Sequence, residues 1–353
     1  MQHARRRTRV RRRRTIAAVV VVAVAAGAAL AAWQAGADAP SNRALADTGR
    51  TMAQRPHVPT ATTAPPLTTT TVPAPTTTQP PPGPPYAVSD ATLTLVDASR
   101  PTPARGSVPS IPSRTMRTVI RRPVGLTGPL PLVVFAHGWN VEPETYEPLL
   151  DAWAAAGYLV AAPECPGSAA ELPGTPVQDY AAQARDLSFV VSSLLDGRAG
   201  PVNPKQIVVA GHSDGGTAVT ILALNPAYAD PRIKAYVNMA GQIPPDVPGP
   251  WGTSPVPGAL LVAVGDEDQY NNLTLSTQAY DAAHMPKALL TVPGGDHLGT
   301  FVAATPTAAA VRAATVRFLG TVFATSGTSF SGAQLAAALQ GSANQPFVVT
   351  SSG

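Results

Sequence analysis

The chain has 353 residues, of which 39 are proline, and a formal net charge of +4 at neutral pH. The prolines cluster, which is typical of an extended segment and argues against a second large core. Eight arginines lie within the first 14 residues, so the rest of the chain is net negative and its sequence gives no indication of nucleic-acid binding. Cys165 is the only cysteine, which excludes an intramolecular disulfide.

Residues 1–37 have the pattern of a membrane-directed segment. An arginine block ends at Arg14, and an uncharged apolar run follows from Ile16 to Trp33. This order predicts one helix in the bilayer, with the arginines on the cytoplasmic side. The small residues of AGADA, at 35–39, leave a second fate open, because they suit cleavage of a signal peptide, whereas the length of the apolar run favours an uncleaved anchor. Either fate predicts export.

Residues 38–86 form a linker, and from Arg55 to Pro85 it is nearly all proline and threonine. Such a composition cannot build a core and predicts an extended spacer of about 3 Å per residue. The linker could hold a following domain away from the membrane, or it could be a passive leader.

Residues 87–326 are predicted to form one domain, followed by a tail at 327–353 with one short Ala/Leu-rich helix. Apolar runs of strand length, such as PLVVFA at 131–136, are typical of strands buried on both faces. The predicted strands span 91–96, 116–120, 132–136, 159–162, 206–210, 235–239, 259–264 and 288–292. The predicted helices span 146–156, 177–195, 215–224, 273–283 and 306–323. This alternation predicts an α/β fold with a mostly parallel eight-stranded sheet flanked by helices, and sites at the carboxyl ends of its strands.

Chemically active residue types follow the ends of three predicted strands in turn. Ser213 lies in GHSDGG after the strand at 206–210, an acidic group follows in GDED, and His297 ends GGDH. The G-x-S-x-G pattern between a strand and a helix, with acid and histidine later in the chain, is the order of an α/β-hydrolase. The alternative interpretation of Ser213 is a helix cap among flexible glycines.

With these motifs, residues 87–322 resemble an α/β-hydrolase of the group that contains chlorophyllases, platelet-activating-factor acetylhydrolases and cutinase-like polyester hydrolases. The resemblance rests on two separated segments, DASRP and SRTMRTVIRRP, and on FAHGWN, AAAGYLVAAPECPGS, QARDLSFVVSSLL, AGHSDGG and PGGDH. It implies the α/β-hydrolase fold and hydrolysis through a catalytic triad.

Ser213 is the candidate nucleophile, and His297 is the candidate base that removes its proton. The GDED segment offers three carboxylates for the third position, which must accept the imidazole N–H. The spacing in similar hydrolases favours Asp268, with Asp266 as the alternative and Glu267 pointing away.

The backbone N–H of Asp214 follows the nucleophile at a helix N-terminus and is one candidate donor to an oxyanion. The resemblance implies that the N–H of Trp139 is the other, and that its indole forms a wall of the acyl pocket, with a hydrophobic cover over the sheet as the plainer interpretation. His137 is expected to order the loop that contains Trp139. Trp251, in the proline-rich loop at 241–258, is either a wall facing the substrate or part of a structural connection.

Two further residues have plain interpretations. His284 competes with His297 for the role of base but lies on a predicted helix, where exposure to solvent is expected. Cys165 has no elbow around it, so a buried apolar thiol is expected.

The sequence therefore predicts an exported serine hydrolase that cleaves carboxylic esters through an acyl-enzyme, without a metal or organic cofactor and without an obligate protein partner. Its expected partners are an ester, whether lipid, polyester or small, and the membrane through the N-terminal helix. It is expected outside the cell, anchored to the membrane or secreted. Peptidase or haloperoxidase chemistry and a catalytically silent envelope-tethered binding module are the alternatives, since a fold does not fix a function.

Overall fold

The computed structural model describes residues 85–252, 258–324, 331–341 and 345–353. The membrane-directed segment and almost all of the linker lie outside these described residues. Within the described ranges, no helix has both the length and the apolar character needed to cross a bilayer.

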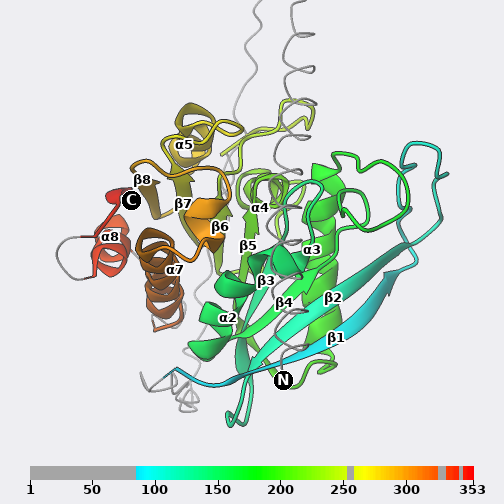
Figure 1. Cartoon of the computed structure of the whole chain (residues 1–353), viewed down its shortest axis with the longest axis horizontal. Coiled ribbons are helices and arrows are strands. Elements are labelled where there is room, and N and C mark those ends of the chain that lie inside the picture. Colours follow the sequence, from blue (N-terminus) through cyan, green and yellow to red (C-terminus); the bar gives the residue numbers. More distant parts are fainter. Residues whose placement is uncertain (1–84, 253–257, 325–330, 342–344) are drawn as a thin grey trace, which may run out of the picture. The chain divides into compact units, whose positions relative to one another are not determined.

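A mixed nine-stranded sheet runs through the described part of the chain (Figure 1). Its strands are β1 (Val88–Asp97), β2 (Arg114–Pro123), β3 (Leu130–Ala136), β4 (Leu159–Pro163), β5 (Val202–His212), β6 (Ala235–Met239), β7 (Ala259–Gly265), β8 (Lys287–Val292) and β9 (Val348–Ser352). Their spatial order is β1-β2-β4-β3-β5-β6-β7-β8-β9. The strands from β4 to β8 pair in parallel, whereas β1/β2, β2/β4 and β8/β9 pair antiparallel. The predicted mostly parallel sheet is confirmed, and each predicted strand corresponds to an observed one.

Helices cover both faces of the sheet. The helices are α2 (Glu147–Ala155), α3 (Tyr180–Leu195), α4 (Asp214–Leu224), α5 (Leu273–Ala282), α6 (Gly299–Val302), α7 (Pro306–Ala324) and α8 (Gly332–Gln340), and a 3-10 helix, η1 (Pro143–Tyr146), precedes α2. Alternate residues of β3 enter the two cores: Leu132 and Val134 belong to the core that includes residues of α3, α4 and α5, whereas Val133 and Phe135 belong to the core that includes residues of α2, α7 and α8. Burial on both faces explains why the central strands are continuous apolar runs.

The ninth strand comes from the tail, where no strand was expected. β9 pairs with β8 from Lys287↔Ser352 to Thr291↔Val348, and α8 packs against α7. Because β9 is an edge strand whose side chains are exposed or only half-buried, its sequence VVTSS lacks the apolar run that marks the central strands. The described tail residues therefore complete one edge of the same sheet.

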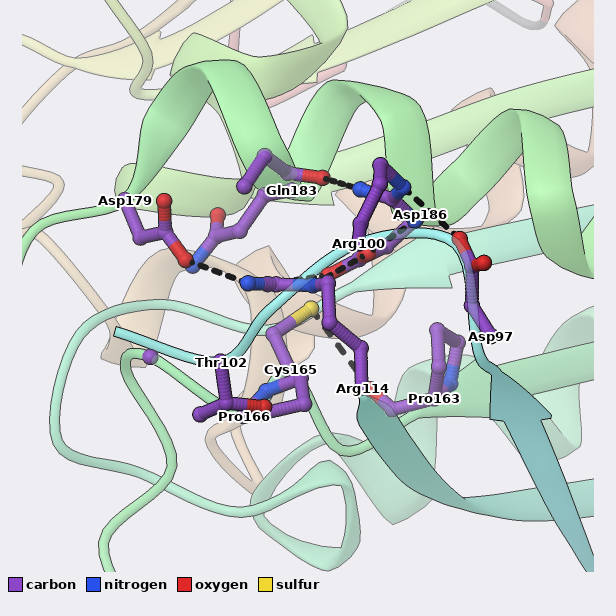
Figure 2. A network of polar contacts seen from close by, with 12 residues as sticks. Asp97, Arg100, Thr102, Arg114, Pro163, Cys165, Pro166, Asp179, Gln183 and Asp186 are labelled. Atoms are coloured by element: carbon purple, nitrogen blue, oxygen red, sulfur yellow. Dashed lines mark hydrogen bonds and ion pairs between the residues drawn. The ribbon is translucent and has the colours of Figure 1, made fainter. Parts of the chain in front are cut away.

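A buried ion-pair network ties the β1–β2 hairpin to α3 (Figure 2). Arg114 donates to both carboxylate oxygens of Asp186 at 2.8 and 2.6 Å, and to Asp179 at 2.9 Å. Arg100 joins the same Asp186 to Asp97, with both contacts at 2.7 Å. Burial opposes the charge of Arg114, but the bonds to Asp186 outweigh it and raise the pKa of this guanidinium. The paired geometry thus compensates for the cost of burying the charges.

Candidate active site

Ser213 lies on a strained turn between β5 and α4. Its φ of 56° and ψ of −119° are unusual for a residue with a side chain. A Cβ atom on Gly211 would lie 2.2 Å from the carbonyl oxygen of Gly215, and one on Gly215 would lie 2.1 Å from that of Ala136. Both glycines are therefore required by close backbone approach. Although Ser213 precedes α4, its side chain makes no capping hydrogen bond, so the helix-cap interpretation does not explain it.

Asp268 and His297 meet beyond the ends of β7 and β8. Asp268 Oδ2 lies 2.6 Å from His297 Nδ1, and the Asp268 side chain is fully buried. The other carboxylate oxygen accepts backbone N–H groups from Tyr270 and Asn271, both at 2.9 Å. With three donors, this carboxylate is fixed in orientation and directed at the imidazole.

The neighbouring carboxylates of the GDED segment point elsewhere. Asp266 is exposed, and its Oδ1 accepts the backbone N–H of Gly294 at 2.7 Å, which fixes the turn before His297. Glu267 is exposed, and its backbone N–H donates to Gly295 O at 3.1 Å. Asp266 therefore supports the histidine loop through the backbone and does not contact the imidazole, whereas Asp268 does.

The loop after β3 packs directly against the serine. A Cβ on Gly138 would lie 3.1 Å from Ser213 Cβ. His137 is fully buried, which lowers its pKa to about 4, so it is neutral at physiological pH. Its Nε2 accepts the N–H of Cys165 at 2.9 Å, so its Nδ1 carries the proton and donates to Gly138 O at 2.7 Å. That carbonyl shares a trans peptide with the N–H of Trp139, which therefore points away from His137.

Asp214 opens α4, where backbone N–H groups have no partner within the helix. Its N–H is thus free to meet a ligand next to Ser213, and the positive helix end favours a negative one. Its side chain is buried, and Oδ2 has no hydrogen-bond partner among the described residues. Burial, with a smaller contribution from Asp246, raises the pKa of this carboxyl to about 7.

The structure does not bring every candidate to this site. Trp251 is half-buried against the core, and the next residue, Gly252, donates its N–H to Leu224 O at 2.9 Å. Leu224 ends α4, about 15 Å along the helix from Asp214. The placement of Trp251 at the far end of α4 favours the structural connection over the wall facing the substrate, because the described part of the proline-rich loop leads to that end.

Trp139 is half-buried beside Gly138. His284 is exposed, as expected, but it lies in the connection between α5 and β8 and not on a helix. It precedes β8, whereas His297 follows the other end of this strand. Cys165 is buried, and burial raises the pKa of its thiol well above the ordinary value, which leaves it unreactive. Among the described residues, no group of histidine, cysteine and carboxylate side chains could hold a metal ion.

Two buried polar residues near Ser213, Tyr146 and His212, had no assigned role in the sequence analysis. His212 precedes the nucleophile, and this position within the G-x-S-x-G motif was the only sequence signal for it. Tyr146 ends η1 and contacts His212 at 2.8 Å. The contact joins residues 66 positions apart, and it depends on the fold.

Comparisons with known proteins agree with this architecture. A family model described as chlorophyllase matches residues 100–243, which include the loop after β3 and the serine turn. A solved ferulic acid esterase from Streptomyces cinnamoneus is similar, with 22% identity and a TM-score of 0.53 over 67% of this chain and 89% of that chain. No curated protein matches the sequence significantly. The chain therefore has the α/β-hydrolase fold and resembles the serine hydrolases of that fold.

Proposed function

We propose that this protein is a serine hydrolase that cleaves carboxylic esters, with Ser213, His297 and Asp268 as its triad. The observation that carries the proposal is the 2.6 Å contact between Asp268 and His297. The carbonyl oxygen of His297 lies 2.7 Å from Nε2 of His212, the residue that precedes Ser213 on its strained turn. A buried carboxylate with three donors keeps the imidazole in one tautomer, with Nε2 free to accept a proton.

In the proposed reaction, His297 Nε2 takes the proton of Ser213 Oγ as this oxygen attacks the ester carbonyl carbon. The tetrahedral oxyanion accepts hydrogen bonds from the N–H groups of Trp139 and Asp214. Collapse breaks the bond to the alcohol, which leaves with the proton from His297. Water then gives a proton to His297 and attacks the acyl-enzyme, and the acid leaves as Ser213 regains its proton. Asp268 stabilises the imidazolium in both halves.

For the acyl group, we propose a site against the half-buried indole of Trp139. This residue follows Gly138, which lies against Ser213. An indole presents a large apolar surface that favours hydrocarbon or aromatic acyl groups. The class of ester is therefore proposed as one with an apolar acyl part.

We also propose that the domain acts outside the cell. The support is the arginine block followed by the apolar run from Ile16 to Trp33, together with the Pro/Thr linker. Mass spectrometry of the N-terminus of the protein recovered from its native cells distinguishes anchor from signal peptide. An intact N-terminus in the membrane fraction supports an anchor, a terminus near residue 38 in the medium supports cleavage, and a cytosolic protein contradicts export.

A panel of p-nitrophenyl esters of graded acyl length, with p-nitroanilides alongside, tests the activity. Wild-type protein should release p-nitrophenol, and Ser213→Ala should lose the activity by several orders of magnitude. Ser276→Ala is the matched control, because Ser276 is a fully buried serine of α5 whose hydroxyl has no hydrogen-bond partner among the described residues. Preference for anilides would favour a peptidase, and no turnover of any substrate would favour the binding module.

A further inference from the structure

A chain of hydrogen bonds runs beneath the site and joins the loop after β3, the serine turn and the histidine loop. Tyr146 and His212 form its centre and are 0% and 2% exposed. The N–H of Gly138 donates to the Tyr146 hydroxyl at 3.1 Å, and this hydroxyl lies 2.8 Å from His212 Nδ1. His212 Nε2 lies 2.7 Å from the carbonyl oxygen of His297. Three segments that the proposed reaction uses are thus connected through two side chains.

The direction of each hydrogen bond in this chain is fixed. Burial, and to a lesser extent the adjacent His297, lower the pKa of His212 well below its ordinary value, so the ring is neutral and carries one proton. A carbonyl oxygen only accepts, so that proton is on Nε2 and donates to His297 O. Nδ1 must then accept from the Tyr146 hydroxyl, whose oxygen accepts from Gly138. Every member has a partner in this one arrangement.

Aromatic packing restricts the same groups. The ring centroids of His212 and His297 lie 4.6 Å apart, and those of His212 and Phe301 lie 5.3 Å apart. Tyr146 packs on Phe135 of β3 at 4.7 Å. His297 is therefore held at its ring by Asp268 and at its backbone by His212.

We propose that Tyr146 and His212 are positioning residues, which hold His297 and the loop after β3 at fixed positions relative to Ser213. The inference rests on the proposed hydrolase function. A shift of a reacting group by about 1 Å can cost on the order of 100-fold in rate, so a device that fixes two loops relative to the nucleophile acts mainly on turnover.

Tyr146→Phe removes one oxygen atom and leaves the ring in place. We expect kcat on a p-nitrophenyl ester to fall about 10- to 100-fold, with KM changed by less than about 2-fold, because orientation is lost and binding is not. Tyr236→Phe is the matched control, since Tyr236 is also fully buried but its hydroxyl has no partner among the described residues. Its kcat should equal that of wild type.

A double-mutant cycle tests whether the two residues act as one unit. His212→Phe keeps an aromatic ring and breaks both bonds, so its kcat should fall at least as far as that of Tyr146→Phe. The double variant should be no slower than His212→Phe alone, because the chain is already broken. Circular dichroism and thermal unfolding of each variant show what fraction is folded, and kcat is taken per folded molecule.

The outcomes separate this inference from the proposed function. If wild-type protein hydrolyses the esters and Tyr146→Phe matches its kcat, or if the losses of the two single variants multiply in the double variant, the positioning role is wrong. If wild-type and Tyr236→Phe proteins both lack esterase activity, the proposed function fails first.

Discussion

Two polar networks lie at the carboxyl end of this sheet, and they differ in the charge of their members. The network around Arg114 is ionic, with the guanidinium 1% exposed and Asp186 fully buried. The chain through Tyr146 and His212 is neutral throughout. Both networks connect segments that are far apart in the sequence. They are expected to differ in the effect of substituting one of their members.

Removal of one charge from a buried pair leaves the other uncompensated, which costs far more than the loss of one neutral hydrogen bond. The ionic network is therefore expected to determine whether β1, β2 and α3 stay together. The neutral chain is expected to determine how accurately two loops are aligned. Substitutions in the first should change the free energy of unfolding, and substitutions around the second should change turnover.

The largest effect is expected at the end of the neutral chain, where His297 meets Asp268. Asp268→Asn should lower kcat about 10,000-fold, because an amide presents a donor or a weaker acceptor to Nδ1 and no longer stabilises the imidazolium. Steady-state kinetics on a p-nitrophenyl ester checks this. Asp266→Asn is the control and should stay close to wild type, since among the described residues its side chain accepts the backbone N–H of Gly294 and does not contact the imidazole. Equal losses in both variants would contradict the assignment of the acid.

The next effect concerns the ionic network. Asp186→Asn should lower the free energy of unfolding by about 3–5 kcal/mol, because Arg114 and Arg100 lose their shared carboxylate. Denaturant-induced unfolding measures the change. Glu144→Gln, at the half-exposed pair with Arg117, should cost less than about 1 kcal/mol. Equal costs would show that burial does not distinguish the two pairs.

An effect of comparable size that depends on pH is expected from Asp214, whose pKa is raised to about 7 in the folded state from an ordinary value of 3.8. Between these values the folded state keeps a proton that the unfolded state has lost, so wild-type stability falls as pH rises. Asp214→Asn removes this dependence. As pH rises across the window, its free energy of unfolding should therefore increase relative to that of wild type by roughly 1.4 kcal/mol per pH unit. The stability difference should level off above pH 7. Unfolding curves from pH 4 to 8 test the sign, and a constant difference would contradict it.

The smallest effect is expected at Trp251, at the far end of α4 from Ser213. Trp251→Ala should leave the relative rates on short and long p-nitrophenyl esters unchanged, although it removes packing against the core. Trp139→Ala should shift that preference, because Trp139 follows Gly138, which lies against Ser213. A changed preference in the Trp251 variant alone would reverse this assignment.

The central strands and the serine turn were predictable because their signals are local. Continuous apolar runs mark β3, β5 and β7, and the glycines around Ser213 follow from close backbone approach. The edge strand β9 lacked such a signal, since its pairing depends on β8 and only Val348 and Val349 are apolar.

The two networks were not predictable for a different reason. Arg114 and Asp186 are 72 positions apart, and charged residues are mostly found on surfaces, so nothing local marked them as a buried pair. The position of Trp251 was not predictable either, because a long proline-rich loop can place its aromatic residue at either end of a helix. Sequence order thus predicted which candidate residues follow the ends of the strands, and only the fold determines which side chains surround them.

The central claim is that Ser213 becomes acylated, and trapping the acyl-enzyme tests it most directly. Wild-type protein mixed rapidly with a p-nitrophenyl ester and quenched in acid should carry the acyl mass on the peptide that contains Ser213. Asp268→Asn should accumulate the adduct more slowly, and Ser213→Ala should carry none. An acyl group on another residue, or ester turnover that continues in Ser213→Ala at the wild-type rate, would contradict the account.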